Sequence, residues 1–311
     1  MYFPYLRGRQ YELLALRELV DAQCLGDHII PIIEPVKLSS TFIKTLSSFI
    51  QNGKEIAVIH NPQVGSFSKD LIDEKKNVVR ENYEELLQNE LIIKAHILNS
   101  SSHAELTQLT GQGFDKKNLL IIIDNRDYLD LYSNEFSTVQ PRYALVPDES
   151  VFRRKIKTNR VLLDDKFEKQ NRNTDYSNVD DEPFSDDHLF YSDDGFIGFS
   201  DYSIVGNHFL EGGFAPYAVA LHIVYFAEDQ SLRVKHFVSD SNGDITNPAG
   251  KFYEALIKLN AWDKAHEMNT LGLTVLLAHF ANETYPGLGT TKKLSMMHHI
   301  ELVGQFFDGV R

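Results

Sequence analysis

The sequence predicts a (β/α)8 barrel of the TIM type, carried by one domain that covers residues 1–311. Eight short apolar runs are bounded by turn residues, helix-like patterns lie between them, and the chain has the length of such a barrel. An open doubly wound sheet is the alternative, because it shows the same alternation of strand and helix.

The eight expected strands cover residues 2–6, 29–34, 56–60, 92–98, 119–124, 143–146, 161–164 and 196–200. Several are apolar at nearly every position, which is typical of strands that are covered on both faces. Residues 10–23 and 41–51 repeat large apolar side chains at helical spacing. Ser102, followed by Glu105 three residues later, predicts a capping box at the start of another helix.

Two additions to a minimal barrel are expected near the seventh and eighth strands. Residues 164–201 carry 12 Asp or Glu against 3 Lys or Arg, so an acidic insertion loop is predicted over residues 166–195. It is interpreted as a mobile lid, a docking segment for a basic partner, or a solvated loop. Residues 217–240 predict a β-hairpin insertion, and further helices are expected from about residue 249 to residue 307.

The composition limits the classes of partner. The net charge of −13 argues against a broad nucleic-acid-binding face, since a strongly acidic surface repels phosphates. No apolar run approaches the roughly 18 residues of a membrane span, and the first residues lack the apolar core of a signal peptide. The single cysteine, Cys24, fits a reducing compartment, so a cytoplasmic location without membrane association is expected.

The start "MYFPYLRGRQYELLALREL", followed by "IIPIIEPVK", resembles the bacterial proteins described as beta family proteins. The later segments "VIHNP", "IIIDNRD", "VLLDD" and "GFSDYSIVG" are also similar to them. The resemblance implies a cytoplasmic factor linked to mobile elements or phage defence, with a companion protein encoded nearby. It carries over no catalytic residue.

If the chain is a barrel, polar residues at the carboxyl ends of the strands line one mouth, where barrel enzymes place their sites. Carboxylates suit Mg²⁺ or Mn²⁺, which would neutralise a phosphate and activate water. The alternative is that the same acids form structural ion pairs with nearby Arg and Lys or cap helices. The expected metal ligands are Glu34, Asp124, Asp164 and Asp201, and the expected catalytic residues are His60, Asp164 and Asp165.

A phosphate-bearing ligand is expected at the same mouth. Arg7 and Arg9 lie two residues apart, so on an extended segment both guanidinium groups point the same way and can grip one anion. Structural pairing with acids is equally open. The other expected ligand-binding residues are Lys37, Asn61, Arg126 and Tyr202.

Known catalytic motifs do not decide the function. The segment "GLGTTKK" lacks the spacing of a phosphate-binding loop, and no nucleophile-elbow or zinc-protease motif is present. Two classes therefore remain. One is a metal-assisted hydrolase of the phosphodiesterase kind, or a protein that binds a phosphate-bearing ligand. The other is a non-catalytic scaffold subunit that recruits a partner protein through the acidic tract and the hairpin.

Overall fold

The computed structural model describes residues 1–210, 212, 216–266 and 268–309. These residues divide into two compact units. Unit 1 contains residues 1–10, 28–165 and 190–202, and unit 2 contains residues 11–27, 166–189 and 203–311. The expected single domain over residues 1–311 therefore differs from the structure, because the second unit builds its own core around a separate sheet.

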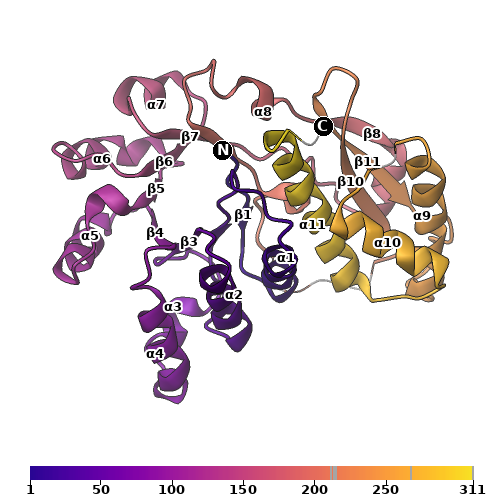
Figure 1. Cartoon of the computed structure of the whole chain (residues 1–311), viewed down its shortest axis with the longest axis horizontal. Helices are drawn as coiled ribbons and strands as arrows, with labels where there is room; N and C mark the ends of the chain where they lie inside the picture. Colours follow the sequence, from indigo (N-terminus) through magenta and orange to yellow (C-terminus); the bar gives the residue numbers. More distant parts are fainter. Residues whose placement is uncertain (211, 213–215, 267, 310–311) are drawn as a thin grey trace. The chain divides into compact units, whose positions relative to one another are not determined.

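Unit 1 is a (β/α)8 TIM-like barrel, and the predicted fold class is confirmed (Figure 1). Its parallel strands lie in the order β1-β2-β3-β4-β5-β6-β7-β9. The ladder is nearly closed, since the amides of Phe3 and Tyr5 donate to the carbonyls of Phe199 and Asp201 over 2.8 Å. The strands are β1 (Tyr5–Leu6), β2 (Ile32–Ile33), β3 (Ile56–Ile59), β4 (Ile92–Ile97), β5 (Leu120–Ile122), β6 (Tyr143–Val146), β7 (Arg160–Leu163) and β9 (Gly198–Ser200).

Alternate residues of these strands fill the barrel. Ile93, Ala95 and Ile97 of β4 belong to the buried interior cluster, together with matching residues of the other strands. Successive side chains of a strand point to opposite faces, so Lys94 and His96 point outward, toward the helices. Each strand therefore presents one row of side chains to the barrel and another to the layer outside it.

Helices follow the strands along the chain, as the sequence predicts. They include α1 (Gln10–Asp21), α2 (Ser40–Gln51), α3 (Phe67–Asp70), η1 (Glu74–Lys76), α4 (Asn77–Leu86), α5 (Ser102–Gly111), η2 (Lys116–Asn118), η3 (Arg126–Tyr128), α6 (Leu129–Glu135) and α7 (Ser150–Lys155). Ser39 caps α2 by accepting the amide of Phe42.

The capping box predicted for α5 is wrong. Ser101 occupies the cap position, and Ser102 is the first helical residue. The Ser102 hydroxyl accepts the amide of Asn99 over 2.8 Å, and the Glu105 carboxylate accepts side-chain amides of Asn61 and Asn99. The two residues with capping-box spacing thus belong to a polar cluster between the helix and the barrel wall.

Gly65 holds the loop between β3 and α3 against the loop after β2. Its φ is +74°, and a Cβ there would overlap the carbonyl oxygen of Val36, which accepts the amide of Ser66 over 2.7 Å. We expect Gly65→Ala to lower the free energy of unfolding by about 2 to 3 kcal/mol, because left-handed strain and a backbone clash add. Urea denaturation measures the effect, and Gly53→Ala is the matched control, since Gly53 also has a positive φ but open space around its Cβ position. Equal losses in the two variants would contradict the clash.

Unit 2 contains a three-stranded antiparallel sheet in the order β10-β11-β8. The hairpin expected over residues 217–240 corresponds to β10 (Ala220–Phe226) and β11 (Leu232–Val238), and β8 (Asp181–Ser185) adds the third strand. The other elements are η4 (Asn173–Asn178), α8 (Asp187–Phe190), η5 (Ser203–Val205), α9 (Pro248–Asp263), α10 (Leu271–Ala281) and α11 (Leu288–Phe307).

The acidic tract is part of this sheet, which differs from the loop predicted over residues 166–195. Asp181 pairs with Arg233 over 2.6 Å and Asp180 pairs with Lys235 over 2.7 Å, so two acids of the tract meet two bases of β11. Lys166 lies 3.1 Å from Asp187 within the tract itself. The sequence signal was misread because the complementary charges lie about fifty residues further along the chain.

Candidate anion-binding site

The barrel mouth is closed by an ion pair. Arg7, which follows β1, bonds the Glu34 carboxylate, which follows β2. The other partners of Glu34 are the Tyr5 hydroxyl at 2.7 Å and the amide of Gln63 at 2.8 Å. Both oxygens of this buried carboxylate are therefore engaged by the protein, as the ion-pair alternative predicts.

The segment of Arg7 and Arg9 is not extended, because Gly8 between them has a φ of +62°. The rule that residues two apart point the same way, on which the predicted clamp depends, therefore does not apply. The Arg7 guanidinium lies 5.4 Å from the centre of the Tyr202 ring, and Tyr202 packs against Tyr5 with ring centres 4.8 Å apart. Tyr202 is thus part of the packing around the ion pair.

The predicted metal ligands have different surroundings. Asp201 is buried and accepts the Tyr2 hydroxyl over 2.8 Å. Because neighbouring residues of an extended segment point to opposite sides, and Tyr202 packs against the barrel interior, the Asp201 side chain points away from that interior. Asp164 accepts the amide of Asp165 over 2.8 Å. Asp124 is exposed.

Within the described ranges, no three His, Cys, Asp or Glu side chains are grouped so that they could hold a metal ion. Each oxygen of the Glu34 carboxylate accepts a hydrogen bond from the protein. The Mg²⁺ or Mn²⁺ site at the mouth stays a prediction.

Charged residues at the barrel mouth affect the protonation of Tyr202. Burial raises the pKa of Tyr202, the negative charges of Asp124, Glu34 and Asp165 add to the rise, and Arg7 opposes it. This hydroxyl stays protonated at neutral pH. Two further predicted ligand-binding residues lie at the surface, where Arg126 pairs with Glu149 over 2.6 Å and Lys37 is exposed.

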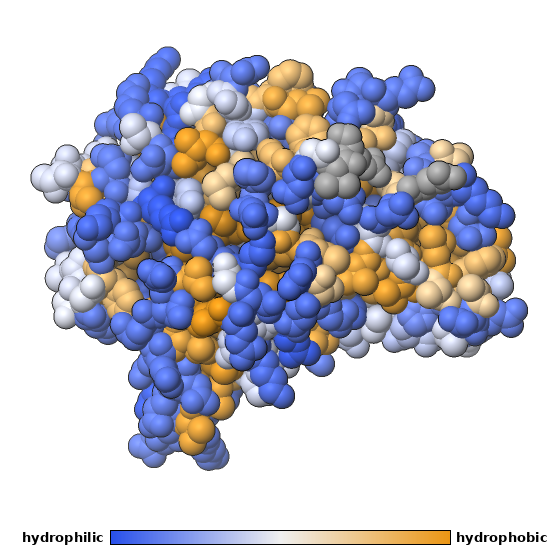
Figure 2. All heavy atoms as spheres, in the orientation of Figure 1, coloured by the Kyte–Doolittle hydropathy of each residue, from blue (hydrophilic) through white to orange (hydrophobic). Residues whose placement is uncertain are grey.

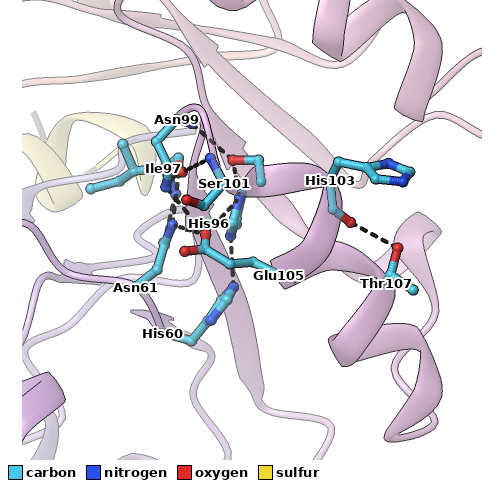
Figure 3. Close-up of polar contacts among 10 residues, drawn as sticks. His60, Asn61, His96, Ile97, Asn99, Ser101, His103, Glu105 and Thr107 are labelled. Carbon is cyan, nitrogen blue, oxygen red and sulfur yellow. Dashed lines mark hydrogen bonds and ion pairs between the residues drawn. The ribbon is translucent and has the colours of Figure 1, made fainter.

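A second polar group lies outside the barrel wall, between β3, β4 and α5 (Figure 3). The Nδ1 of His96 in β4 lies 2.7 Å from the Nε2 of His60, which follows β3. Its Nε2 lies 2.7 Å from the Ser102 hydroxyl at the start of α5. The two imidazole rings stack with centres 4.8 Å apart.

Asn61 fixes this arrangement. Its side chain exchanges two hydrogen bonds with the backbone of Ile97, at 2.9 and 3.0 Å, and donates to Glu105 over 3.0 Å. Figure 3 shows Asn61, Asn99 and Glu105 surrounding one end of the histidine pair. Asn61, expected to bind ligand at the mouth, instead ties the end of β3 to β4 and α5.

The direction of this series of hydrogen bonds depends on the Ser102 hydroxyl, which accepts the amide of Asn99 and has one proton of its own to donate. If Ser102 donates that proton to His96 Nε2, His96 donates through Nδ1 to His60 Nε2, and His60 Nδ1 carries an N–H. Burial lowers the pKa of His60 to about 3 and that of His96 to about 4, and the nearby positive charge of Lys94 adds to the shift of His60. Both rings are neutral at physiological pH.

Lys94, two residues before His96, is a buried lysine. It is 6% exposed, and its ammonium lies over the Phe114 ring. In the part of the chain that the structure describes, no carboxylate or other hydrogen-bond acceptor pairs with this ammonium. Burial lowers the pKa of Lys94 to about 8, so the protein holds a costly, mostly protonated amine at neutral pH.

Lys94 and His60 line one pocket of about 670 Å³, here called the Lys94 pocket. Its polar lining also includes Asn61, Arg80 and Glu105. Its apolar lining comprises Leu71, Ile72, Tyr83, Leu87, Leu109 and Phe114, from the segment of α3 and α4 and from α5 and the residues after it.

The lobe of α3 and α4 presents hydrophobic areas among hydrophilic ones (Figure 2), and Ile72 there is 80% exposed. Tyr83 also lines this pocket, and its hydroxyl is buried without a hydrogen-bond partner among the described residues.

The sequence contained a signal for Lys94 that was not used. In "IIKAHIL" a lysine interrupts an otherwise apolar strand at a position that faces the helices. A buried lysine is rare unless it is paired. Tyr83 and Arg80 gave no such signal, because their roles depend on the packing of α4.

Ser102→Ala is expected to destabilise the protein by about 1 to 3 kcal/mol, because it strands the amide of Asn99 and the Nε2 of His96 in a buried environment. Urea denaturation measures the loss, and Ser101→Ala, one residue earlier at an exposed position, is the control. A Ser102→Ala variant as stable as this control would contradict the hydrogen-bond chain.

Comparisons of the chain with protein-family models, with curated proteins and with solved structures found no match. None of the helices in the described ranges has the length and apolar character needed to cross a membrane.

Proposed function

We propose that unit 1 is a ligand-binding barrel and that the Lys94 pocket binds a small molecule with a phosphate group. The single observation that carries the proposal is the Lys94 ammonium at the pocket wall, for which the described residues supply no acidic partner. An anion there would supply the missing counter-charge.

The surroundings of Lys94 favour a phosphate group over a single-point anion. The neutral His60 offers an N–H in the tautomer that accepts from His96, and the Tyr83 hydroxyl lacks an acceptor among the described residues. Arg80 also lines the pocket, where it donates to the Leu71 carbonyl over 3.0 Å and lies 3.8 Å from the Glu84 carboxylate. Several donors on different elements suit an oxyanion with several acceptor oxygens. The apolar part of the lining and the volume of about 670 Å³ leave room for an organic remainder.

The other classes predicted from the sequence receive less support. Metal-assisted hydrolysis at the mouth requires free carboxylates, whereas Glu34 bonds Arg7 and Asp201 bonds Tyr2. Recruitment of a basic partner by the acidic tract would depend on its exposed acids, such as Asp193 and Asp194, because Asp181 pairs with Arg233. His60 is accordingly assigned a binding role instead of the predicted catalytic one.

The resemblance to beta family proteins supports a bacterial setting of phage defence or mobile elements. In that setting, a barrel that binds a phosphate-bearing metabolite would act as the sensing part of a system with a companion protein. This context remains a proposal, and the binding test does not depend on it.

Thermal unfolding with phenyl phosphate, inorganic phosphate and benzyl alcohol tests the proposal. We expect phenyl phosphate to stabilise the protein most, by about 2.7 kcal/mol at a hundredfold excess over its dissociation constant. Benzyl alcohol, which lacks the anion, is expected to have little effect. The response should fall in Lys94→Met and persist in Lys44→Met, a variant at an exposed lysine of α2. An equal response in both variants would overturn the assignment of the pocket.

Tyr83→Phe provides a milder test of the same pocket. It removes only the orphaned hydroxyl, so we expect unchanged or slightly higher stability and about tenfold weaker binding of phenyl phosphate. Isothermal titration calorimetry measures the affinity. Unchanged affinity would mean that the hydroxyl does not meet the ligand.

A further inference from the structure

A chain of three titratable side chains crosses the sheet of unit 2. The Glu182 carboxylate of β8 accepts the Nε2–H of His236 in β11 over 3.0 Å. The Nδ1 of His236 lies 2.8 Å from the Nδ1 of His222, its direct cross-strand partner in β10. Because His236 donates through Nε2, its Nδ1 accepts the proton of His222 Nδ1. The Nε2 of His222 is then left as an acceptor.

This chain ends at a cavity of about 260 Å³, here called the His222 cavity. Lys292 of α11 and Lys169 line it, together with the amide side chain of Asn173 and the hydroxyl groups of Thr291 and Ser295. The lining thus combines cations and neutral hydrogen-bonding groups with the end of a histidine chain. The Lys94 pocket belongs to the other unit.

The surroundings keep the two histidines, His222 and His236, neutral in the free protein. Burial lowers the pKa of His222 well below its usual value, and the positive charges of His236 and Lys292 add to this. Burial also lowers the pKa of His236, which Glu182, Asp180 and Asp181 oppose.

Aromatic rings enclose the two histidines. The ring of Tyr176 in η4 lies 4.5 Å from that of His222 and 4.7 Å from that of His236, and Phe167 lies 5.1 Å from His222. His236 is buried and His222 is partly buried, so a charge placed in the cavity is screened less at the imidazole pair than it would be in bulk water.

We propose that the His222 cavity is a second oxyanion site, which binds a small phosphate monoester and takes up one proton through the chain from His222 to Glu182. The proton enters at His222 Nε2, and the proton on His222 Nδ1 moves to His236 Nδ1. His236 then carries the positive charge beside the Glu182 carboxylate, and His222 is neutral again with its proton on Nε2, where it donates to the oxyanion. No bond other than N–H changes, and the proton comes from solvent.

Proton uptake distinguishes this proposal from simple attraction of anions by lysines. Sulfate is the first probe, because it does not titrate between pH 5 and 8. All measurements use the Lys94→Met variant as the parent protein, so that the result does not depend on whether the Lys94 pocket binds anions. Calorimetry in two buffers of different ionisation enthalpy gives the protons taken up per sulfate. We expect close to one at pH 7, with affinity falling about tenfold per pH unit above that.

Substitutions assign the proton to the chain. In the same background, Glu182→Gln should reduce the uptake, because the stored charge loses its partner, and Lys292→Met should weaken sulfate binding while uptake persists. Sulfate that binds without proton uptake, or uptake that persists in His222→Gln, would overturn the proposal. Glycerol 3-phosphate should bind more tightly than inorganic phosphate, and equal affinities would overturn the assignment to a monoester.

Discussion

Glu34→Gln is expected to lower the free energy of unfolding by about 3 to 5 kcal/mol, because it leaves the Arg7 guanidinium without its counter-charge inside the barrel mouth. The amide keeps the shape of the carboxylate but places an N–H donor where Arg7 and Tyr5 both donate. The loss of stability therefore measures the broken polar interactions and not the creation of a cavity. Urea denaturation at neutral pH, followed by circular dichroism, measures it.

Glu149→Gln is the matched control for this change. Glu149 pairs with Arg126 at the surface, with side chains 39% and 67% exposed, and such pairs contribute about 0 to 1 kcal/mol. If the two substitutions cost the same, the mouth would not be held by its ion pair. The Glu34 carboxylate would then be open to the metal role predicted from the sequence.

Lys94→Met is expected to stabilise the ligand-free protein by up to about 3 kcal/mol at pH 7, since a pKa displaced from 10.5 to about 8 corresponds to that penalty. Between pH 8 and pH 10.5 the unfolded chain keeps this proton and the folded protein releases it. Stability of the natural protein therefore rises with pH in this window, and the penalty is complete below pH 8. The gain of the variant should shrink over the same range.

Urea denaturation of both proteins at pH 7, 8, 9 and 10 measures this convergence. Lys44→Met is the control, because Lys44 is exposed and its removal should shift stability by less than about 0.5 kcal/mol at each pH. A Lys94→Met variant that is less stable than the natural protein at pH 7 would contradict the unpaired ammonium. It would indicate that Lys94 has a partner in solution.

The barrel was predictable because its strands carry their own signal. β3 and β6 are apolar on both faces, and each is bounded by turn residues. The expected ranges lie within a few residues of the observed strands, with larger trimming at β1 and β2. Periodicity reflects the local order of apolar and polar residues along the chain. In a parallel barrel with a helix after each strand, this local order is enough to predict most of the elements.

The sites were less predictable because they depend on contacts between distant segments. The positive φ of Gly8 turned Arg7 toward Glu34 and removed the clamp expected with Arg9. The role of the acidic tract depended on β11, whose Arg233 meets Asp181. Ser102 matched a capping motif, but its hydroxyl bonds His96, a choice that only the packing of α5 against β4 determines.

The titration of Lys94 itself tests the central claim most directly. The ¹³Cε signal of this lysine, assigned by comparison with Lys94→Met, can be followed from pH 6 to pH 11 with and without saturating phenyl phosphate. We expect a midpoint near pH 8 in the free protein and a clear upward shift with the ligand, because the bound phosphate group stabilises the ammonium. A midpoint near 10.5 in the free protein, or a midpoint that phenyl phosphate leaves unchanged, would contradict the account of the Lys94 pocket as an anion-binding site.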